Sequence, residues 1–288
     1  EDIFAPANNK NNAEALWSIT HSTNTALNPQ SSNPNRLFRW YLAKYTGLCG
    51  MPSTEVLEYG RDGASRMMPT KYLLNVFNED IDSRYYGSFR EEYKIPVTAS
   101  KYSWSATDIT RFKKSFAAGS VTLQPGDTAL LYTKKVIADK ASRKYGVKDI
   151  NDLYNADGTI SNDANNNPYY PALRKFRDPD RTAGSDAGTK DVIVMRLAEM
   201  YLIAAEASYK LNKTSPSAAD FINVLRTRAA IKTPVDHTAE MQVTNAQINL
   251  NFLLDERARE LAGEHLRWPD LKRTKQLENR LGEGKQNP

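Results

Sequence analysis

The chain has 288 residues, a formal net charge of +5 and a single cysteine, Cys49. Its basic residues are dispersed among acidic ones and form no cluster of about five or more, so nucleic acid is not the expected partner. No apolar run approaches the roughly 20 residues that span a bilayer. One cysteine excludes an intrachain disulfide. The length allows a sizeable core, in one large domain or two small ones.

The first 110 residues are predicted to be rich in loops. Residues 15–20 have the apolar spacing of a short strand or a helix end, and 31–110 intersperse Pro, Gly, Asn and aromatic residues. The clearest helical segment here is 70–77. Further along, a Pro-Gly pair in 121–132 separates two β-prone runs, which predicts a hairpin or two extended strands. Residues 149–167 are polar and turn-rich, and we expect a surface excursion.

Segment 196–211 is predicted to be a helix. Apolar or small residues recur along it in steps of four and three: Leu197, Tyr201, Ala204, Ser208 and Leu211. Residues 212–217 supply a break, and Pro216 can occupy the first turn of a second helix that ends near Ile231. With Tyr201, Ala204 and Ala205 on the packing face, the pair loosely matches a tetratricopeptide-like hairpin, without the full Trp, Gly and Pro signature.

A third helix is predicted from Thr244, because Thr244 and Gln247 have the spacing of a capping box. An apolar stripe follows, and we expect it to be buried: Leu250, Leu253, Leu254, Ala258, Leu261 and Ala262. Trp268 and Pro269 interrupt this helix before helical spacing resumes at 270–277. We expect Trp268 to lie in the core or between helices rather than to serve as a ligand platform.

The charged residues of the third helix permit two interpretations. Asp255 and Arg259 lie four apart on one face, and further charges surround them: Glu256, Arg257, Glu260, Glu264 and Arg267. We favour a solvated face. The alternative is a partly buried ion network that fixes the helix register, which is costly unless every charge is paired.

Recognised catalytic and metal-binding patterns are missing. The three histidines, His21, His237 and His265, are too far apart for an HExxH zinc helix. The chain has no G-x-S-x-G elbow, GxGxxG motif or P-loop, and nothing local supports Cys49 as a nucleophile. Acids in 149–157 are wrongly spaced for a calcium loop. We therefore expect no cofactor and no metal. The 34 acidic residues leave a pair of glycosidase carboxylates as an alternative without supporting it.

Three C-terminal segments carry a family resemblance: RLAEMYLIAAEA (196–207), INVLRTRAAI (222–231) and LDERARELAGEHLRWPDLKR (254–273). In this order and at these separations they resemble the C-terminal part of the SusD/RagB family. Several front-half segments are also similar to the family, among them NNAEALWSI (11–19), YLAKYTGLCGM (41–51) and YPALRKFRDPDR (170–181). Family members usually carry an earlier helical half with three more tetratricopeptide-like repeats.

The resemblance implies an outer-membrane lipoprotein of Bacteroidetes at the cell surface. Such a protein captures an oligosaccharide or another nutrient and passes it to a SusC-like TonB-dependent transporter, without breaking a bond. The chain begins at Glu1 with neither a basic n-region nor an apolar h-region, so we expect the signal peptide and the lipid-bearing cysteine to lie outside it.

Aromatic residues of the loop-rich front half are the candidates for ligand binding. Aromatic rings suit carbohydrates because the apolar C–H faces of a sugar stack on them while its hydroxyls meet polar side chains. Core burial is the alternative for each ring, but rings beside Gly, Pro, Asn and Arg on loops are more often exposed. The selected residues are Trp40, Tyr41, Tyr45, Tyr59 and Trp104.

The sequence therefore predicts a mainly α protein, in which a tetratricopeptide-like helical hairpin packs against a loop-rich insert with short β-hairpins. We assign 1–190 to the insert and 191–288 to the C-terminal helical region. The predicted function is glycan or nutrient binding, not catalysis. The alternatives are a helical-repeat adaptor for a protein partner and, less favoured, a glycoside hydrolase.

Overall fold

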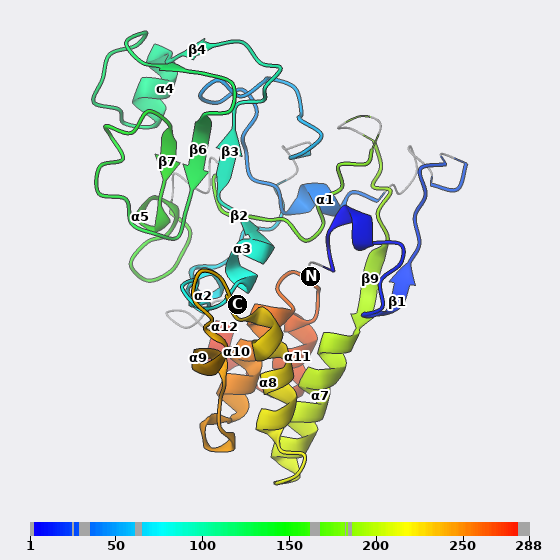
Figure 1. Cartoon of the computed structure of the whole chain (residues 1–288). Coiled ribbons are helices and arrows are strands. Elements are labelled where there is room, and N and C mark those ends of the chain that lie inside the picture. The colour runs from blue at the N-terminus through cyan, green and yellow to red at the C-terminus, as the bar shows by residue number, and fades with distance from the viewer. Residues whose placement is uncertain are drawn as a thin grey trace.

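The computed structural model of the chain describes residues 3–24, 26–28, 35–60, 65–161, 168–181, 183 and 186–281. Helix predominates over strand among these residues, as the sequence predicts. The longer helices gather in the C-terminal part of the chain, and a loop-rich part with short strands lies above them (Figure 1). No helix in the described ranges is both long and apolar enough to cross a membrane.

The loop-rich part contains short elements joined by turns. Its helices are η1 (Pro6–Asn8), α1 (Leu37–Trp40), α2 (Lys71–Asn75), α3 (Arg84–Ser88), α4 (Ala106–Arg111) and α5 (Ile150–Leu153). Its strands are β2 (Phe89–Arg90), β3 (Glu92–Lys94), β4 (Tyr102–Ser103), β5 (Thr122–Leu123), β6 (Thr128–Tyr132), β7 (Gly146–Lys148) and β8 (Ala172–Leu173). Thr70 caps α2 through its side chain, which confirms the helix predicted at 70–77.

The strands form small separate sheets. β6 is central in a three-stranded sheet, antiparallel to β3 and parallel to β7. β5 pairs with β4, and β2 pairs with β8. The runs predicted around Pro125 and Gly126 are therefore extended strands, but not a hairpin, because each finds its partner in another segment. Tertiary pairing outweighs the local turn signal here.

Tyrosines and phenylalanines fill the core of the loop-rich part. Tyr45 and Tyr93 stack with ring centroids 5.2 Å apart, and Phe77, Tyr85 and Phe89 contact one another edge to face or at a tilt. Such ring pairs stabilise by about 0.5–1.5 kcal/mol beyond their burial. Aromatic packing therefore compensates for the scarcity of long regular elements.

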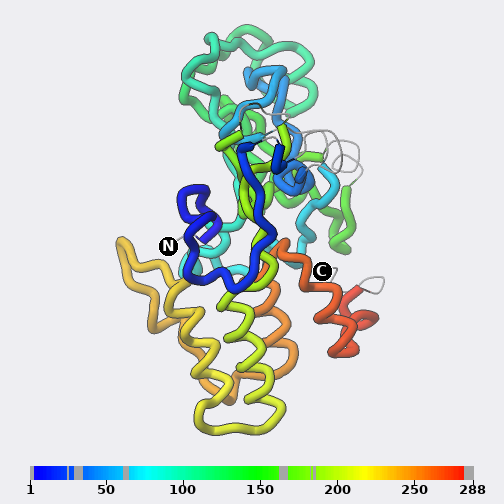
Figure 2. Tube along the Cα trace, turned by 90° about the vertical axis from the view of Figure 1, so that its right-hand side faces the viewer, coloured from blue at the N-terminus to red at the C-terminus, as the bar shows by residue number. Residues whose placement is uncertain are grey.

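A two-stranded ribbon connects the two parts. β1 (Ala15–Ile19) pairs antiparallel with β9 (Val192–Arg196), although some 170 residues separate them along the chain. In the turned view the N-terminal segment runs beside the segment that enters the helices (Figure 2). β9 leads directly into the first long helix, so the ribbon fixes where the helical part begins.

The helical part begins with an antiparallel pair. α7 (Leu197–Lys210) and α8 (Ala218–Ala229) pack side by side, followed by α9 (Thr238–Met241), η2 (Asn245–Gln247), α10 (Leu250–Glu260), α11 (Arg267–Arg273) and α12 (Leu277–Leu281) (Figures 1 and 2). Strong helix formers such as Ala, Leu and Glu dominate α7. A second apolar core lies between α7, α8 and α10, centred on Leu202, Ile222, Leu225 and Leu253.

Three details of the predicted helices were wrong. Ala205 and Ser208 are buried as predicted, but the rest of the buried face of α7 contains Ala198 and Leu202, whereas Leu197 and Leu211 are exposed. The reason is that Arg196, just before the helix, is buried in ion pairs that fix its rotation. The other two details concern the residues at which α8 and α10 begin.

Capping side chains set the start of α8 and α10. Ser217 and Asp220 form a capping box, so α8 starts after Pro216 and not with it in the first turn. Thr244 does form a capping box with Gln247, but this box caps the short η2 turn, and Asn249 caps α10. The predicted apolar stripe of α10 is confirmed for Leu253, Leu254 and the residues that follow: Ala258, Leu261 and Ala262.

Candidate functional site

Three of the five aromatic residues selected from the sequence are buried. Tyr45 is 0% exposed and Trp104 is 1% exposed, and Tyr41 is also in the core. The Tyr45 hydroxyl donates to the Gly60 carbonyl at 2.6 Å, and the Trp104 Nε1–H donates to the Lys144 carbonyl at 2.8 Å. Both rings therefore satisfy their polar ends inside the protein. The exposure that a stacking platform requires is absent from these three side chains.

Trp40 and Tyr59 are only partly buried. Both pack against the core of the loop-rich part. The Arg90 guanidinium lies over the Tyr59 ring at 4.5 Å, and the Tyr59 hydroxyl accepts the Lys94 backbone N–H at 3.1 Å. One face of Tyr59 is thus already occupied by a cation. Ligand binding by Trp40 and Tyr59 stays a prediction.

Trp268, in contrast, is exposed where the sequence predicts burial. The sequence placed this ring in the core, yet it is 58% exposed. It does not interrupt a helix, because α10 ends at Glu260 and α11 begins at Arg267, with Trp268 and Pro269 in its first turn. The next residues, Asp270 and Leu271, occupy the buried face of α11. Their burial leaves the indole on the solvent side.

The indole borders a cleft of about 520 Å³ between α10, the turn 261–266, α11 and the segment that leads into α2. Aliphatic, thioether and aromatic side chains make up most of its wall. The lining residues are Tyr41, Met67, Met68, Tyr72, Leu73, Arg257, Ala258, Leu261, Ala262, Gly263, His265, Leu266, Arg267, Trp268, Asp270 and Leu271. We call this the Trp268 cleft. Its volume lies within the ~300–1,000 Å³ typical of small-molecule sites.

A glycine-dependent turn shapes one end of the Trp268 cleft. Gly263 has φ +77°, and a Cβ at this position would lie 2.2 Å from Leu173 Cδ2, so no other residue fits without a shift. The Tyr41 hydroxyl donates to the Gly263 carbonyl at 2.9 Å, and its ring stacks on Phe176 at 5.3 Å. Burial raises the pKa of Tyr41 to about 12, with a further contribution from the charge of Glu264. Tyr41 therefore remains a neutral donor at physiological pH.

A polar cluster lies at the Tyr72 side of the cleft. The Tyr72 hydroxyl donates to Asp255 Oδ1 at 2.5 Å and accepts from Arg280 Nη1 at 2.9 Å. Burial raises the pKa of Tyr72, and the hydrogen bond to Asp255 adds to this effect. Arg267 donates to the Leu254 carbonyl at 2.8 Å. The bonds to Asp255 and Arg280 hold the tyrosine ring in place.

Arg257 supplies a buried donor on the cleft wall. Its Nε donates to Asp270 Oδ2 at 2.6 Å, and the side chain is 4% exposed. Among the residues that the structure describes, none accepts a hydrogen bond from the buried Arg257 Nη1. A buried polar group without a partner costs roughly 1–3 kcal/mol, and more when it is charged. An acceptor supplied by a ligand would remove that cost.

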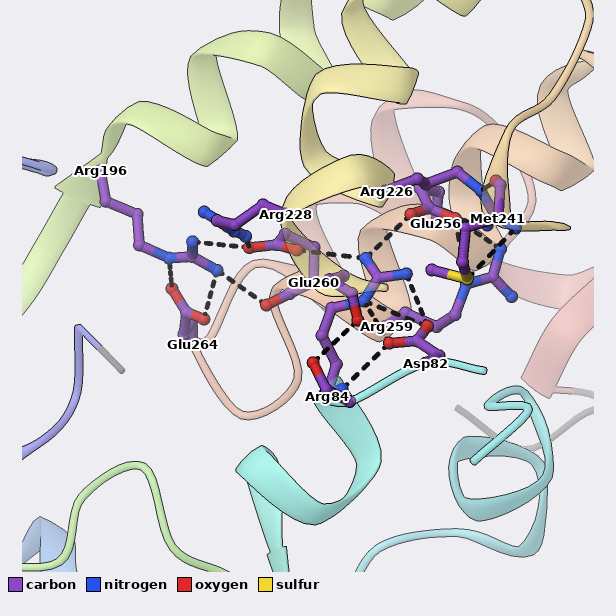
Figure 3. A network of polar contacts seen from close by, with 12 residues as sticks. Asp82, Arg84, Arg196, Arg226, Arg228, Met241, Glu256, Arg259, Glu260 and Glu264 are labelled. Carbon is purple, nitrogen blue, oxygen red and sulfur yellow. Dashed lines mark hydrogen bonds and ion pairs between the residues drawn. The ribbon is translucent and has the colours of Figure 1, made fainter. Parts of the chain in front are cut away.

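The charges of α10 form a buried network, not the solvated face that we favoured. Six cations, Arg84, Lys175, Arg196, Arg226, Arg228 and Arg259, and five carboxylates, Glu14, Asp82, Glu256, Glu260 and Glu264, are linked by ion pairs (Figure 3 shows most of them). We call this set the ion network. Glu256 and Glu260 are buried, and neighbouring arginines lower the pKa of both carboxyls, against the opposing effect of burial.

The sequence could not decide whether the charges of α10 are buried, and it could not reveal that Trp268 is exposed. Helical periodicity places the charges of α10 on faces, but their partners, among them Arg84 and Arg196, come from distant elements. The exposure of Trp268 follows from the rotation of α11, which the Arg257–Asp270 pair fixes.

In the described part of the chain no group of three or more His, Cys, Asp or Glu could hold a metal ion. The Trp268 cleft is therefore suited to binding an organic ligand through an exposed indole, apolar walls and a buried donor.

Comparison with known proteins gives one family throughout. The family model of the SusD family matches residues 3–287. SusD-like protein P2 of Formosa agariphila is 34% identical over 111 residues, which are 38% of this chain and 22% of that protein. A SusD superfamily protein of Bacteroides thetaiotaomicron is 28% identical, with a TM-score of 0.30, over 36% of this chain and 21% of that one.

The fold extends over almost the whole chain in a third comparison. NanU of B. fragilis aligns with 94% of this chain and 45% of its own, at a TM-score of 0.50 and 19% identity. This likeness concerns the fold alone. The chain spans less than half the length of each of these relatives.

Proposed function

The chain belongs to the SusD family, and on this premise we propose that it is a nutrient-binding protein that holds a glycan at the cell surface for a SusC-like TonB-dependent transporter. Family members are generally binding proteins, not enzymes. The outer membrane would be its location, with a lipid anchor outside this chain. Within this proposal the α7–α8 hairpin is a tetratricopeptide-like repeat, and 1–190 and 191–288 are separate regions.

Trp268 carries the proposal for the binding site. A tryptophan that is 58% exposed beside a cleft of about 520 Å³ leaves a large apolar face in water. The C–H face of a pyranose ring can cover the indole, which removes apolar surface of both partners from water. The apolar wall from Met67, Met68 and Leu73 would exclude water around the bound sugar.

Polar contacts would then orient the ligand. After a small side-chain movement, a sugar hydroxyl oxygen can accept the N–H of Arg257 Nη1, which is buried and lacks an acceptor among the described residues. A hydrogen bond to a charged group contributes about 1.5–3 kcal/mol to binding. This contribution is larger in a desolvated cleft than in water. Stacking provides affinity and the guanidinium provides orientation. No bond of the sugar is broken.

The test uses two exposed tryptophans. Calorimetry with the strongest ligand from a glycan array should show that Trp268→Ala weakens binding roughly tenfold, which is about 1.4 kcal/mol. Trp17→Ala is the matched control, because Trp17 is 60% exposed but lies on β1, away from the cleft. Both variants should keep the parent's unfolding midpoint. If Trp268→Ala binds like the parent, or both variants lose affinity equally, the site lies elsewhere.

Trp40→Ala and Tyr59→Ala test the remaining residues that the sequence selected. A loss of affinity in these variants with full affinity in Trp268→Ala would move the site to the loop-rich part. The same ligand incubations report on hydrolysis, since a glycosidase releases reducing ends. We expect no release. If reducing ends are still released after further purification, and mutation of one acidic residue abolishes their release, the protein is a glycosidase and the proposed binding function is wrong.

A further inference from the structure

A second cavity of about 290 Å³ lies where α3, β9, α8 and α10 meet. Its charged lining comes from Arg84, Lys175, Arg196, Arg228, Arg259 and Glu260. We call it the basic pocket. These side chains belong to the ion network, but the other four carboxylates of that network are not among the residues that line the cavity. Five cations and one carboxylate therefore line the same cavity.

The balance of the whole ion network also favours a further anion. It contains six cations against five carboxylates, and the Glu260 carboxylate is already shared by Arg84, Arg196 and Arg228 at 3.1, 2.8 and 2.5 Å. One of the five, Glu14, is partly exposed and lies at the edge of the network. Arginines held in a partly desolvated site attract an anion more strongly than they would in water.

Arg228 gives a ligand access to the pocket. Its side chain is 33% exposed, the most of the five lining cations, and it contacts Glu14 at 3.1 Å. An exposed pair of this kind contributes only about 0–1 kcal/mol. An incoming oxyanion can therefore replace Glu14 at the Arg228 guanidinium, whose planar set of N–H donors matches two oxygens of one anion.

We propose that the basic pocket is a binding site for an oxyanion, either a free inorganic anion or the carboxylate of an acidic sugar. The oxyanion contacts Arg228 at the entrance and is held by the field of Arg84, Lys175, Arg196 and Arg259 inside. This site is separate from the Trp268 cleft, because Arg259 and Glu260 of α10 line it, whereas Arg257, Ala258 and Leu261 line the cleft. The inference does not depend on the glycan-binding function.

Two variants change the pocket in different ways. Arg228→Gln removes the entrance charge and leaves Glu260 paired with Arg84 and Arg196. Gly87→Met adds bulk to the pocket wall without changing charge, since Gly87 lines the pocket and a Cβ there meets no atom within 4 Å. Arg177→Gln is the matched control, because Arg177 is a partly exposed arginine that pairs with Glu58 outside the pocket.

The full chain is titrated in a calorimeter with sodium sulfate against sodium chloride at equal ionic strength, and with glucuronate against glucose. We expect sulfate, glucuronate or both to bind the parent and Arg177→Gln, and to bind both pocket variants at least about tenfold more weakly. Sulfate binding alone identifies a free anion as the ligand, and preference for glucuronate identifies an acidic sugar. Trp268→Ala should bind the anion like the parent.

The proposal is overturned if neither anion binds the parent, or if Arg228→Gln and Gly87→Met bind as tightly as Arg177→Gln. Circular dichroism of each variant establishes that it is folded. If one pocket variant fails to fold, the other still decides the outcome.

Discussion

Glu256 shows at the scale of a single residue how this fold uses buried charge. Its side chain is 0% exposed and pairs with Arg84, Arg226 and Arg259 at 2.8, 2.9 and 2.7 Å. Burial of such ions costs several kcal/mol each, so the network as a whole need not increase stability over an apolar core. Removal of one member has a different consequence, because its partners stay buried without compensation.

Glu256→Gln should therefore lower the free energy of unfolding by about 3–5 kcal/mol at pH 7. The three arginines would keep their positive charges without the carboxylate that separates them. Urea unfolding measures the change. Glu240→Gln is the control, since Glu240 is exposed and pairs only with His237 among the residues described, and it should change stability by less than about 0.5 kcal/mol. A loss below about 1 kcal/mol for Glu256→Gln would show that the carboxylate is dispensable.

At the scale of elements, α10 connects the features described above. Its apolar residues close the second core, its arginine at 257 borders the Trp268 cleft, and its two central glutamates join the ion network. The turn after it depends on Gly263, which has a left-handed φ and at which a Cβ would clash with Leu173. The position of α10 thus determines the geometry of both candidate sites.

Leu254→Ala tests the rotation of α10. Leu254 is 0% exposed, so truncation removes buried apolar contacts and leaves a cavity, and we expect a loss of about 2–5 kcal/mol in urea unfolding. Val224→Ala on α8 is a suitable comparison, because that side chain is exposed and its truncation should cost far less. A loss under about 0.5 kcal/mol for Leu254→Ala would mean that α10 is rotated differently.

At the scale of the whole molecule, the ion network joins the loop-rich part to the helices. Asp82 and Arg84 come from the segment around α3, and Glu256 and Glu260 come from α10 (Figure 3). Burial raises the pKa of each glutamate, and the neighbouring arginines lower it by more. The pKa of Glu256 falls to about 2, that of Glu264 is also lowered, and that of Glu260 lies well below its ordinary value.

A fall in pH should therefore lower the free energy of unfolding, because it protonates these carboxyls. A carboxyl whose pKa is lower in the folded state binds its proton more readily when the chain unfolds. The stability that Glu256 contributes is complete above its ordinary pKa of 4.5 and is lost as the pH falls toward about 2. Unfolding of the parent and Glu256→Gln at pH 7, 5, 3 and 2 measures this. The difference between them should narrow below about pH 4.5, and a constant difference would contradict the assigned pKa.

The sequence correctly predicted a mainly helical C-terminal part and the family. It identified α2, α7, α8 and α10 because caps and apolar periodicity are local signals that each segment carries in its own residues. It included Ala205 and Ser208 in the buried face of α7 but placed Leu197 and Leu211 there in place of Ala198 and Leu202. It also left open whether the runs around Pro125 and Gly126 form a hairpin or separate strands. Those outcomes depend on segments far away along the chain.

The candidate site was the least predictable feature. Aromatic residues in irregular sequence can be buried or exposed, and residue type does not distinguish Tyr45, fully buried, from Trp268, largely exposed. The sequence by itself determined the family, the helices and the supply of rings and charges. Only the tertiary structure decided which rings reach solvent and which charges pair, because exposure and ion pairing depend on the rotation and packing of elements that meet only when the chain is folded.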